Sequence, residues 1–252
     1  MWRFSGQIVA FTGEMGSGKT LTSFKNALLT LEEERRTSLI CNFSINGKAL
    51  CSFLCRNGLI WSLKVFQRGG IICRSTTPSG KLDLEYFLGD DRDSIYIYDE
   101  AGATANKRHW RDITTTALER LTQLRKKNRR LFWTAQFFDQ VDCQLQDLTS
   151  DVVLCRGANR YNSQMRAPEL KFVFNRLYAK TTYSKRIHNT KLAEGRFSSI
   201  FMSIVHSRDW EFKSVSENDI LLLDACNSLA EVSSQPVLTN PWMVKQQSSI
   251  YR

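Results

Sequence analysis

The segment from residue 13 to residue 20 constrains the fold of this chain more than any other. Its glycines, lysine and threonine have the spacing of a phosphate-binding loop, in the order Gly13, Glu14, Met15, Gly16, Ser17, Gly18, Lys19 and Thr20. An apolar run at residues 7–11 precedes the loop, and a helix-forming run at residues 20–33 follows it. Loops of this kind connect a strand to a helix, so the sequence predicts a nucleotide-binding corner in an α/β sheet.

The residue types of this loop suit the binding of ATP and Mg²⁺. The glycines let the backbone turn tightly, so that successive amide groups can face phosphate oxygens. Lys19 can reach the outer phosphates as a point charge, and the Thr20 hydroxyl can bind Mg²⁺. The helix that follows presents its positive end to the same anion. We therefore expect a nucleoside triphosphate and a magnesium ion at this corner.

Two adjacent carboxylates end a second apolar strand. The run at residues 94–98 is rich in β-forming residues, and Asp99 and Glu100 follow it directly. In phosphate-loop enzymes an acid at such a strand end serves the magnesium ion, so we assign Asp99 to the metal together with Thr20. Glu100 is predicted to orient and polarise the water that attacks the γ-phosphate. Two acids can also start a solvated loop, but the upstream phosphate loop disfavours that interpretation.

Gln136 is a third candidate for the reaction centre. It follows an apolar strand predicted at residues 131–135. An amide at this position can contact both the γ-phosphate and the attacking water. The residues alone fit equally well a turn glutamine whose amide is satisfied by loop backbone.

Short apolar runs alternate with helical segments in the first part of the chain, which predicts a mainly parallel sheet flanked by helices. Between residues 44 and 87, glycines and Pro78 interrupt the pattern, so we expect short elements with a hairpin or an insertion. Elsewhere in this part, strands are expected at residues 7–11, 38–43, 94–98, 131–135 and 152–155, and helices at residues 20–33, 113–127 and 138–148.

The last third of the chain has a different pattern. Strand-like segments at residues 170–178 and 198–206 predict a β-rich C-terminal extension at the sheet edge. Ser216 is placed to cap a final helix that ends near Leu229. The polar composition beyond it suggests a tail that is disordered or docked elsewhere. The expected organisation is an ATPase core at residues 1–160, an extension at residues 161–230 that completes the same domain, and a polar tail at residues 231–252.

The chain is strongly basic, with a net charge of +10 and an isoelectric point near 9.4. Such an excess indicates an anionic partner, for example nucleic acid or an acidic lipid surface. The basic run at residues 125–130 suits an arginine finger for a neighbouring subunit, a contact with a nucleic-acid backbone, or a solvated helix end. No signal peptide is visible and no apolar stretch is long enough to span a bilayer, so we expect a soluble protein.

The chain resembles the FtsK–HerA superfamily of DNA-pumping ATPases. Within it, the sequence is similar to the genome-packaging ATPases of membrane-containing viruses and to the Zot-like proteins of filamentous phages. The resemblance covers about residues 5–157 and rests on the phosphate loop and on residues 42–45, 96–101 and 124–136. Gln136, at the tip of its strand, is the most discriminating feature.

The resemblance implies a RecA-like P-loop NTPase core that forms a ring, with a hexamer as the expected form. Such a ring translocates double-stranded DNA while it hydrolyses ATP between subunits. An arginine that precedes the glutamine strand looks like Arg125, which would then act on the nucleotide of the neighbouring subunit. Arg129 and Arg130 are the alternatives for this role.

The resemblance also bears on the biological setting. Zot-like proteins usually carry a membrane span after the ATPase domain, and this sequence has none. That difference favours genome packaging in the host cytoplasm or in association with the virion, with a capsid vertex or a membrane protein as a further partner. The alternatives are a replication initiator or helicase of AAA+ or RecA type, and a membrane-associated assembly or secretion ATPase of Zot-like type.

Overall fold

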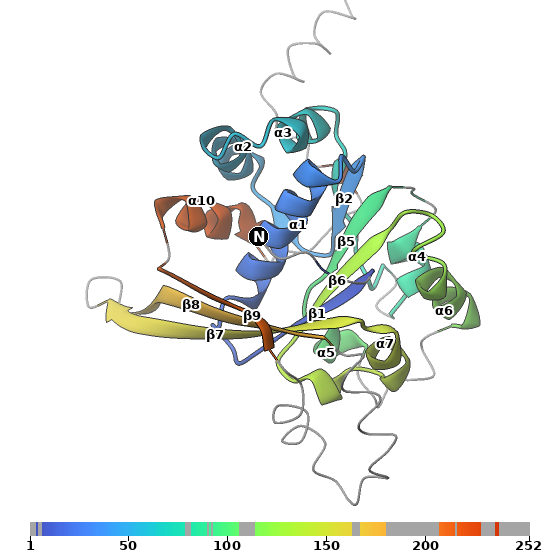
Figure 1. Ribbon diagram of the computed structural model, residues 1–252. Coiled ribbons are helices and arrows are strands. Elements are labelled where there is room, and N and C mark those ends of the chain that lie inside the picture. Colours follow the sequence, from blue (N-terminus) through green and yellow to red (C-terminus); the bar gives the residue numbers. More distant parts are fainter. Residues whose placement is uncertain are drawn as a thin grey trace, which may run out of the picture.

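A nine-stranded sheet forms the centre of the molecule (Figure 1), with the strand order β11-β4-β2-β5-β6-β1-β7-β8-β9. The computed structural model describes residues 4, 7–78, 82–89, 91, 93–105, 114–162, 167–179, 207–214, 216–227 and 235–236. The strands of the sheet are β1 (Ile8–Thr12), β2 (Ser38–Cys41), β4 (Ile71–Cys73), β5 (Ser94–Tyr98), β6 (Arg130–Ala135), β7 (Asp151–Asn162), β8 (Ala167–Ala179), β9 (Ser207–Ser214) and β11 (Gln235–Pro236).

Six neighbouring strands, from β4 to β7, run parallel. Strand β6 lies between β1 and β5, so that Phe132 is in register with Val9 on one side and with Ile97 on the other. The carboxyl ends of these three strands therefore meet at one edge of the sheet. Strands β8, β9 and β11 are antiparallel to their neighbours and lie outside the parallel core. This arrangement confirms the predicted RecA-like α/β fold with a β-rich C-terminal extension.

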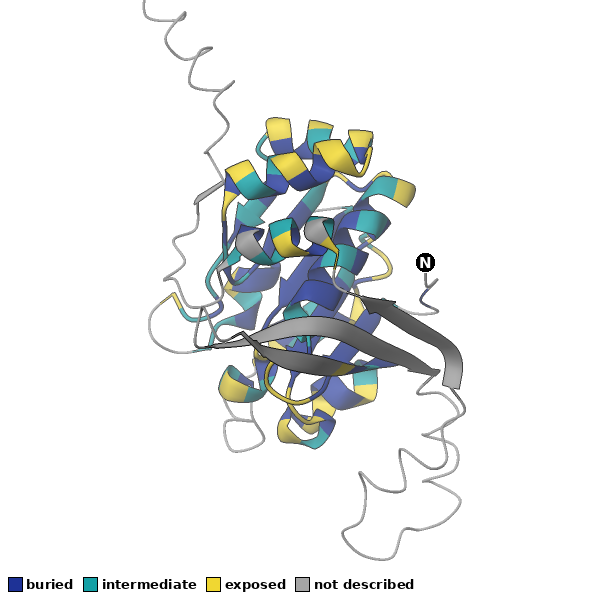
Figure 2. Ribbon diagram, turned by 90° about the vertical axis from the view of Figure 1, so that its left-hand side faces the viewer, coloured by how far each residue is buried: buried dark blue, intermediate teal, exposed yellow. Residues whose placement is uncertain are grey.

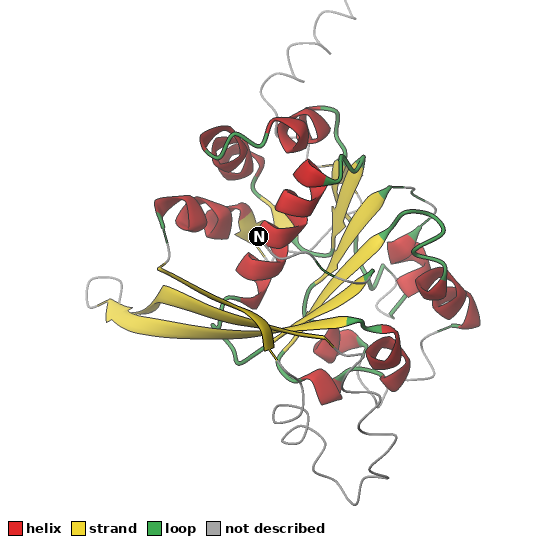
Figure 3. Ribbon diagram, viewed as in Figure 1, coloured by secondary structure: helices red, strands yellow, loops and turns green. Residues whose placement is uncertain are grey.

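Helices cover both faces of the sheet (Figure 3). Successive side chains of a strand point to opposite faces, so Val9 and Phe11 join one core while Ile8 and Ala10 join the other. Figure 2 shows the buried residues in the interior of the molecule. The first core is covered by α1 (Lys19–Glu33), α2 (Gly47–Arg56), α3 (Ile60–Gln67) and α10 (Glu217–Ala225), and the second by α4 (Leu84–Leu88), α5 (Ala101–Thr104), α6 (Thr115–Thr122), the 3-10 helix η2 (Phe138–Gln140) and α7 (Cys143–Leu148).

The region between residues 44 and 87 is more regular than we predicted. It contains α2, α3, α4 and strand β4, which belongs to the central parallel sheet. Helix α2 begins where the Asn46 side chain accepts hydrogen bonds from two amides of its first turn, at 3.1 and 3.4 Å. Helix α3 begins where Glu32, from α1, accepts the amides of Trp61 at 3.1 Å and Ser62 at 2.8 Å. Because this second cap comes from a distant residue, local sequence did not reveal it.

Two helices of the second layer are shorter than predicted. The helix expected at residues 113–127 is observed as α6 over Thr115–Thr122, and residue 113 lies outside the described residues. The helix expected at residues 138–148 is divided into η2 and α7. Asp142 separates them, because its side chain accepts the Gln144 amide at 2.8 Å and so starts a new helix.

The C-terminal segments fold back onto the core. Ser216 caps α10 in a capping box with Asp219, as predicted. The helix ends at Ala225, before the predicted Leu229, because the short strand β10 (Cys226–Asn227) pairs with β3 (Ser44–Ile45). Strand β7 continues past the expected boundary at residue 160.

Two expectations for this part of the chain concern residues that are not described. The strand predicted at residues 198–206 lies wholly outside the described residues, and so does the tail from residue 231 except for β11, which pairs with β4. Among the helices that are described, none is long and apolar enough to cross a membrane.

Candidate functional site

The phosphate loop connects β1 to α1 at the sheet edge where β5 and β6 also end. The Gly13 amide donates a hydrogen bond to the Gln136 carbonyl at 3.2 Å, which ties the start of the loop to the end of β6. Gly13 has a φ of 152°, and a Cβ atom there would lie 2.1 Å from the carbonyl oxygen of Cys155. Gly18, directly before α1, has a φ of 84°. Both positions therefore require glycine, as expected for a phosphate loop.

Two polar groups of the loop fit an anionic ligand. The Oγ atom of Ser17 is buried and has no hydrogen-bond partner among the described residues. The Lys19 ammonium group donates to the Glu14 carbonyl at 2.8 Å. Burial lowers the pKa of Lys19, because the charged form loses solvation. An orphaned hydroxyl and a partly desolvated cation are both suited to phosphate oxygens.

Asp99 lies at the end of β5 and accepts hydrogen bonds from two hydroxyl groups. The Oγ1 atom of Thr20 is 3.0 Å from each of its carboxylate oxygens, and the Thr134 hydroxyl donates to one of them at 2.6 Å. Burial raises the pKa of Asp99, and the two hydroxyl hydrogen bonds oppose that rise. A hydroxyl beside a carboxylate provides the hard oxygen ligands that Mg²⁺ prefers, so Thr20 and Asp99 fit the predicted metal site.

Asn42, which follows β2, clamps the backbone of Asp99. Its Nδ2 atom donates to the Asp99 carbonyl at 2.9 Å, and its Oδ1 atom accepts the Asp99 amide at 2.6 Å. Thr134 adds a third bond by accepting the Glu100 amide at 2.9 Å. Glu100 has a φ of 54°, which is unusual for a residue other than glycine. We did not predict Asn42 or Thr134 as site residues, although both lie in segments on which the family resemblance rests.

Glu100, Gln136 and Lys19 line one cavity of about 760 Å³, a size typical of small-ligand sites. The side chains of Glu100 and Gln136 are exposed there. The side-chain amide of Gln136 makes no hydrogen bond with a described residue, so no described loop backbone satisfies it. The structure thus brings Glu100 and Gln136 into the lining of the cavity that the phosphate loop also lines.

The C-terminal part of the chain also lines this cavity, which we did not predict. Leu223 of α10 and Cys226 of β10 are lining residues. Helix α10 is fixed to α1 by an ion pair between Lys25 and Asp219 at 2.5 Å, and Cys226 is in register with Ile45. Burial raises the pKa of the Cys226 thiol, which keeps it neutral. No local pattern signals these contacts, because they depend on how the chain returns to the core.

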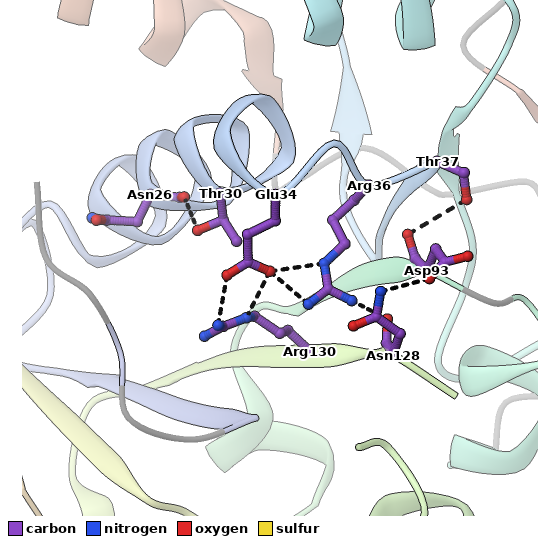
Figure 4. A network of polar contacts seen from close by, with 8 residues as sticks. All are labelled: Asn26, Thr30, Glu34, Arg36, Thr37, Asp93, Asn128 and Arg130. Carbon is purple, nitrogen blue, oxygen red and sulfur yellow. Dashed lines mark hydrogen bonds and ion pairs between the residues drawn. The ribbon is translucent and has the colours of Figure 1, made fainter. Parts of the chain in front are cut away.

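The three arginines considered for the finger lie near the opposite end of β6 and differ in environment. Arg129 is fully buried and donates to the carbonyls of Asp91 and Gly89. Arg130 pairs with Glu34 at 2.6 Å, within the polar network of Figure 4. These contacts exclude both residues as fingers. Arg125 is exposed, and its side chain forms no ion pair with a described residue.

One comparison with known proteins identifies a family for the chain. The family model described as zonular occludens toxin (Zot) matches residues 7–169. A search of curated proteins gives no match. The family match covers more than half of the chain.

Three solved structures are similar to the chain at low identity. The N-terminal domain of zonular occludens toxin from Neisseria meningitidis is 13% identical with a TM-score of 0.44, over 85% of this chain and 96% of that one. The genome packaging NTPase B204 from Sulfolobus turreted icosahedral virus 2, in complex with ATP-γS, is 12% identical with a TM-score of 0.37, over 69% and 92%. A KaiC-like protein from Pyrococcus horikoshii OT3 is 15% identical with a TM-score of 0.41, over 69% and 78%. No function is carried over from these structures.

Proposed function

This chain belongs to the zonular occludens toxin (Zot) family, and from that premise we propose that it is an ATPase that moves double-stranded DNA. The observation that carries the proposal is the composition of one cavity. Lys19 of the phosphate loop, Glu100 and Gln136 all line it. A cation for the outer phosphates and an exposed carboxylate for water are the two groups that hydrolysis of a triphosphate needs.

The reaction follows from the positions of these groups. Glu100 accepts a proton from water, the water oxygen bonds to the γ-phosphorus, and the bond from that phosphorus to the ADP oxygen breaks. Gln136 orients the water and contacts the transferred phosphate. Mg²⁺, held on the Thr20 hydroxyl and the Asp99 carboxylate, would neutralise charge on the phosphate oxygens. Asn42 and Thr134 keep Asp99 and Glu100 at the end of β5.

A ring of identical subunits, with six as the expected number, would complete the site. Lys19 is the single cation among the described residues that line the cavity. Met15, which lines the cavity, is 83% exposed, and Phe137, directly after Gln136, is 56% exposed, which suits coverage by a second copy. Arg125 precedes β6 and Gln136 follows it, so the length of this strand, about 20 Å, lies between them. Arg125 does not line the cavity of its own chain, and its proposed target is the nucleotide of the next subunit.

DNA is the proposed cargo because the chain carries a net charge of +10 and motifs that resemble DNA-pumping ATPases. Its proposed biological role is genome packaging, in the host cytoplasm or at a capsid vertex. A second candidate is a membrane-associated assembly ATPase, favoured by the family match itself.

Triplex displacement tests DNA movement directly. A labelled third strand is annealed to linear duplex DNA, and its release is followed with the full chain, ATP and Mg²⁺. The proposal predicts ATP-dependent release by the wild type and none by Lys19→Ala. Hydrolysis of ATP without release on any duplex would overturn DNA movement. Recruitment of the protein to anionic vesicles under those conditions would favour the assembly ATPase instead, and separation of a forked duplex would favour a helicase.

A further inference from the structure

We propose that the outer surface of α2 and α3 binds the phosphate backbone of DNA. The sequence from residue 35 to residue 82 contains eight lysines and arginines and no aspartate, glutamate or histidine. The chain as a whole has 35 basic and 25 acidic residues, so this stretch departs sharply from the average. Its assignment to DNA rests on the proposed function.

Four of these cations form the α2–α3 basic face: Lys48, Arg56, Lys64 and Arg68. The two helices contact each other and lie side by side at one end of the molecule (Figure 1). Lys48 and Arg56 lie in the first and last turns of α2, Lys64 lies in α3, and Arg68 is the residue directly after α3. All four side chains are exposed, and Figure 2 shows exposed positions on the outer turns of these helices.

The cations of the α2–α3 basic face have no acidic partner among the described residues, unlike several other cations of the protein. None of the four forms an ion pair with a described residue. In contrast, four arginines elsewhere each pair with a carboxylate, namely Arg36, Arg74, Arg120 and Arg130. Unpaired like charges repel one another, so an arrangement of this kind suits an external anion.

The stability of the two helices does not explain why each cation of the α2–α3 basic face is present. Arg56 and Lys64 lie in the last turns of their helices, where a cation complements the helix dipole. Lys48 lies in the first turn of α2, where the dipole disfavours a cation. A partner anion gives a reason for Lys48 that the dipole does not.

The apolar residues of these helices favour DNA over a lipid surface. The large apolar side chains Leu50, Phe53, Leu54 and Phe66 are buried in the core, and Ile60 is the one large apolar residue of α2 and α3 that is markedly exposed. Helices that bind in a membrane interface present several aromatic or leucine side chains to it. A cationic surface without such anchors fits a phosphate backbone.

None of the four cations of the α2–α3 basic face belongs to the nucleotide cavity, and its α3 part lies away from the phosphate loop. Glu32 anchors the start of α3 near the end of α1, thirteen residues after Lys19, which is about 20 Å along the helix at 1.5 Å per residue. None of the four cations lines the cavity. Their substitution should therefore leave ATP hydrolysis without DNA unchanged.

Fluorescence anisotropy with a labelled mixed-sequence DNA duplex tests the assignment. The full-length wild type is compared with a variant that combines Lys48→Gln, Arg56→Gln, Lys64→Gln and Arg68→Gln, at salt concentrations from about 50 to 200 mM. The matched control exchanges lysine and arginine at the same four positions and keeps every charge. Each lost phosphate contact flattens the slope of log affinity against log salt by about 0.9, so the neutral variant should show a slope flatter by roughly three to four.

The outcomes separate this surface from the proposed function. The assignment holds if the neutral variant loses affinity and slope while the charge-exchanged control matches the wild type and the ATPase rate without DNA is unchanged. If the wild type and the neutral variant bind DNA equally well, the α2–α3 basic face does not bind DNA, and the proposal that the protein moves DNA is unaffected. No DNA binding by the wild type overturns both. Loss of binding to phosphatidylserine vesicles, with DNA binding retained, assigns the face to membranes and overturns the DNA assignment.

Discussion

Replacing Thr134 by valine tests how the site keeps Asp99 ionised. Valine has nearly the shape of threonine but cannot donate to Asp99 or accept from the Glu100 amide, which Thr134 does at 2.6 and 2.9 Å. Burial raises the pKa of Asp99, and the Thr134 hydrogen bond is the largest contribution that lowers it. Its removal therefore raises the pKa of Asp99 further, and the carboxylate is charged only at higher pH.

The size of the effect follows from the two lost hydrogen bonds. A hydrogen bond to a charged group contributes about 1.5–3 kcal/mol, and a buried amide left without a partner costs about 1–3 kcal/mol. Loss of the first contribution lowers kcat/KM by up to about ten- to hundredfold on the acidic limb, where Asp99 is protonated in the variant but ionised in the wild type. The cost of the unpaired Glu100 amide appears instead as a lower free energy of unfolding.

The assay is steady-state ATP hydrolysis as a function of pH, at saturating Mg²⁺. We expect the acidic limb of the profile to move to higher pH in Thr134→Val. Thr134→Ser restores the hydroxyl and should return the limb to the wild-type position, although it loses a methyl group. A Thr134→Val enzyme that is folded, slower and unchanged in its acidic limb would refute the role of this hydrogen bond in the ionisation of Asp99.

Three further predictions concern backbone strain, capping and buried charge. Gly13→Ala places a Cβ atom 2.1 Å from a carbonyl oxygen of β7, so we expect a loss of at least about 2 kcal/mol in the free energy of unfolding and no ATP binding, measured by denaturant titration and fluorescent-nucleotide binding. Burial raises the pKa of Glu32, but amide hydrogen bonds from the start of α3 outweigh burial and lower it. The stability that Glu32 adds to the fold is therefore present above the pKa of Glu32 in the unfolded chain and is lost as the pH falls through its pKa in the folded chain. The melting temperature of Glu32→Gln, measured against pH, should lack this fall in acid. Burial raises the pKa of Asp99, so the ionised carboxylate lowers the stability of the folded chain once the pH exceeds that pKa. Asp99→Asn should therefore raise the melting temperature of the nucleotide-free protein by a few degrees at neutral pH, a gain of about 1 kcal/mol in the free energy of unfolding. The same variant should lose Mg²⁺-dependent hydrolysis.

The sequence alone predicted the parts of the fold that local pattern determines. The loop from Gly13 to Thr20 has a fixed spacing, and all the parallel strands except β4 are apolar runs that could be identified before the structure. Helix α3 could not, because Glu32 caps it from another helix. The helix expected up to residue 127 ends early, and Asn128, with a φ of 52°, leads to the buried Arg129. A basic run usually indicates a solvated surface, and this one contains a core residue.

In the candidate site too, local pattern predicts some residues, and others depend on contacts between distant parts of the chain. Asp99, Glu100 and Gln136 follow apolar strands directly, and parallel strands end at a common edge, so their proximity could be predicted. Asn42 acts through hydrogen bonds to the backbone of Asp99, a relation that appears only when β2 and β5 are paired. The contribution of Cys226 to the cavity depends on the return of the C-terminal segment to β3, and no periodicity in the sequence encodes it.

Single-turnover hydrolysis by Glu100→Gln tests the central claim most directly. Nucleotide binding and product formation are measured on the same samples of the full chain, with Mg²⁺ and duplex DNA present. Glutamine has nearly the size of glutamate but cannot take a proton from water, so the variant should bind ATP with wild-type affinity and form ADP at least about a hundredfold more slowly. Wild-type rates of ADP formation in Glu100→Gln would contradict the assignment of the water-activating carboxylate, and with it the proposed mechanism of this ATPase.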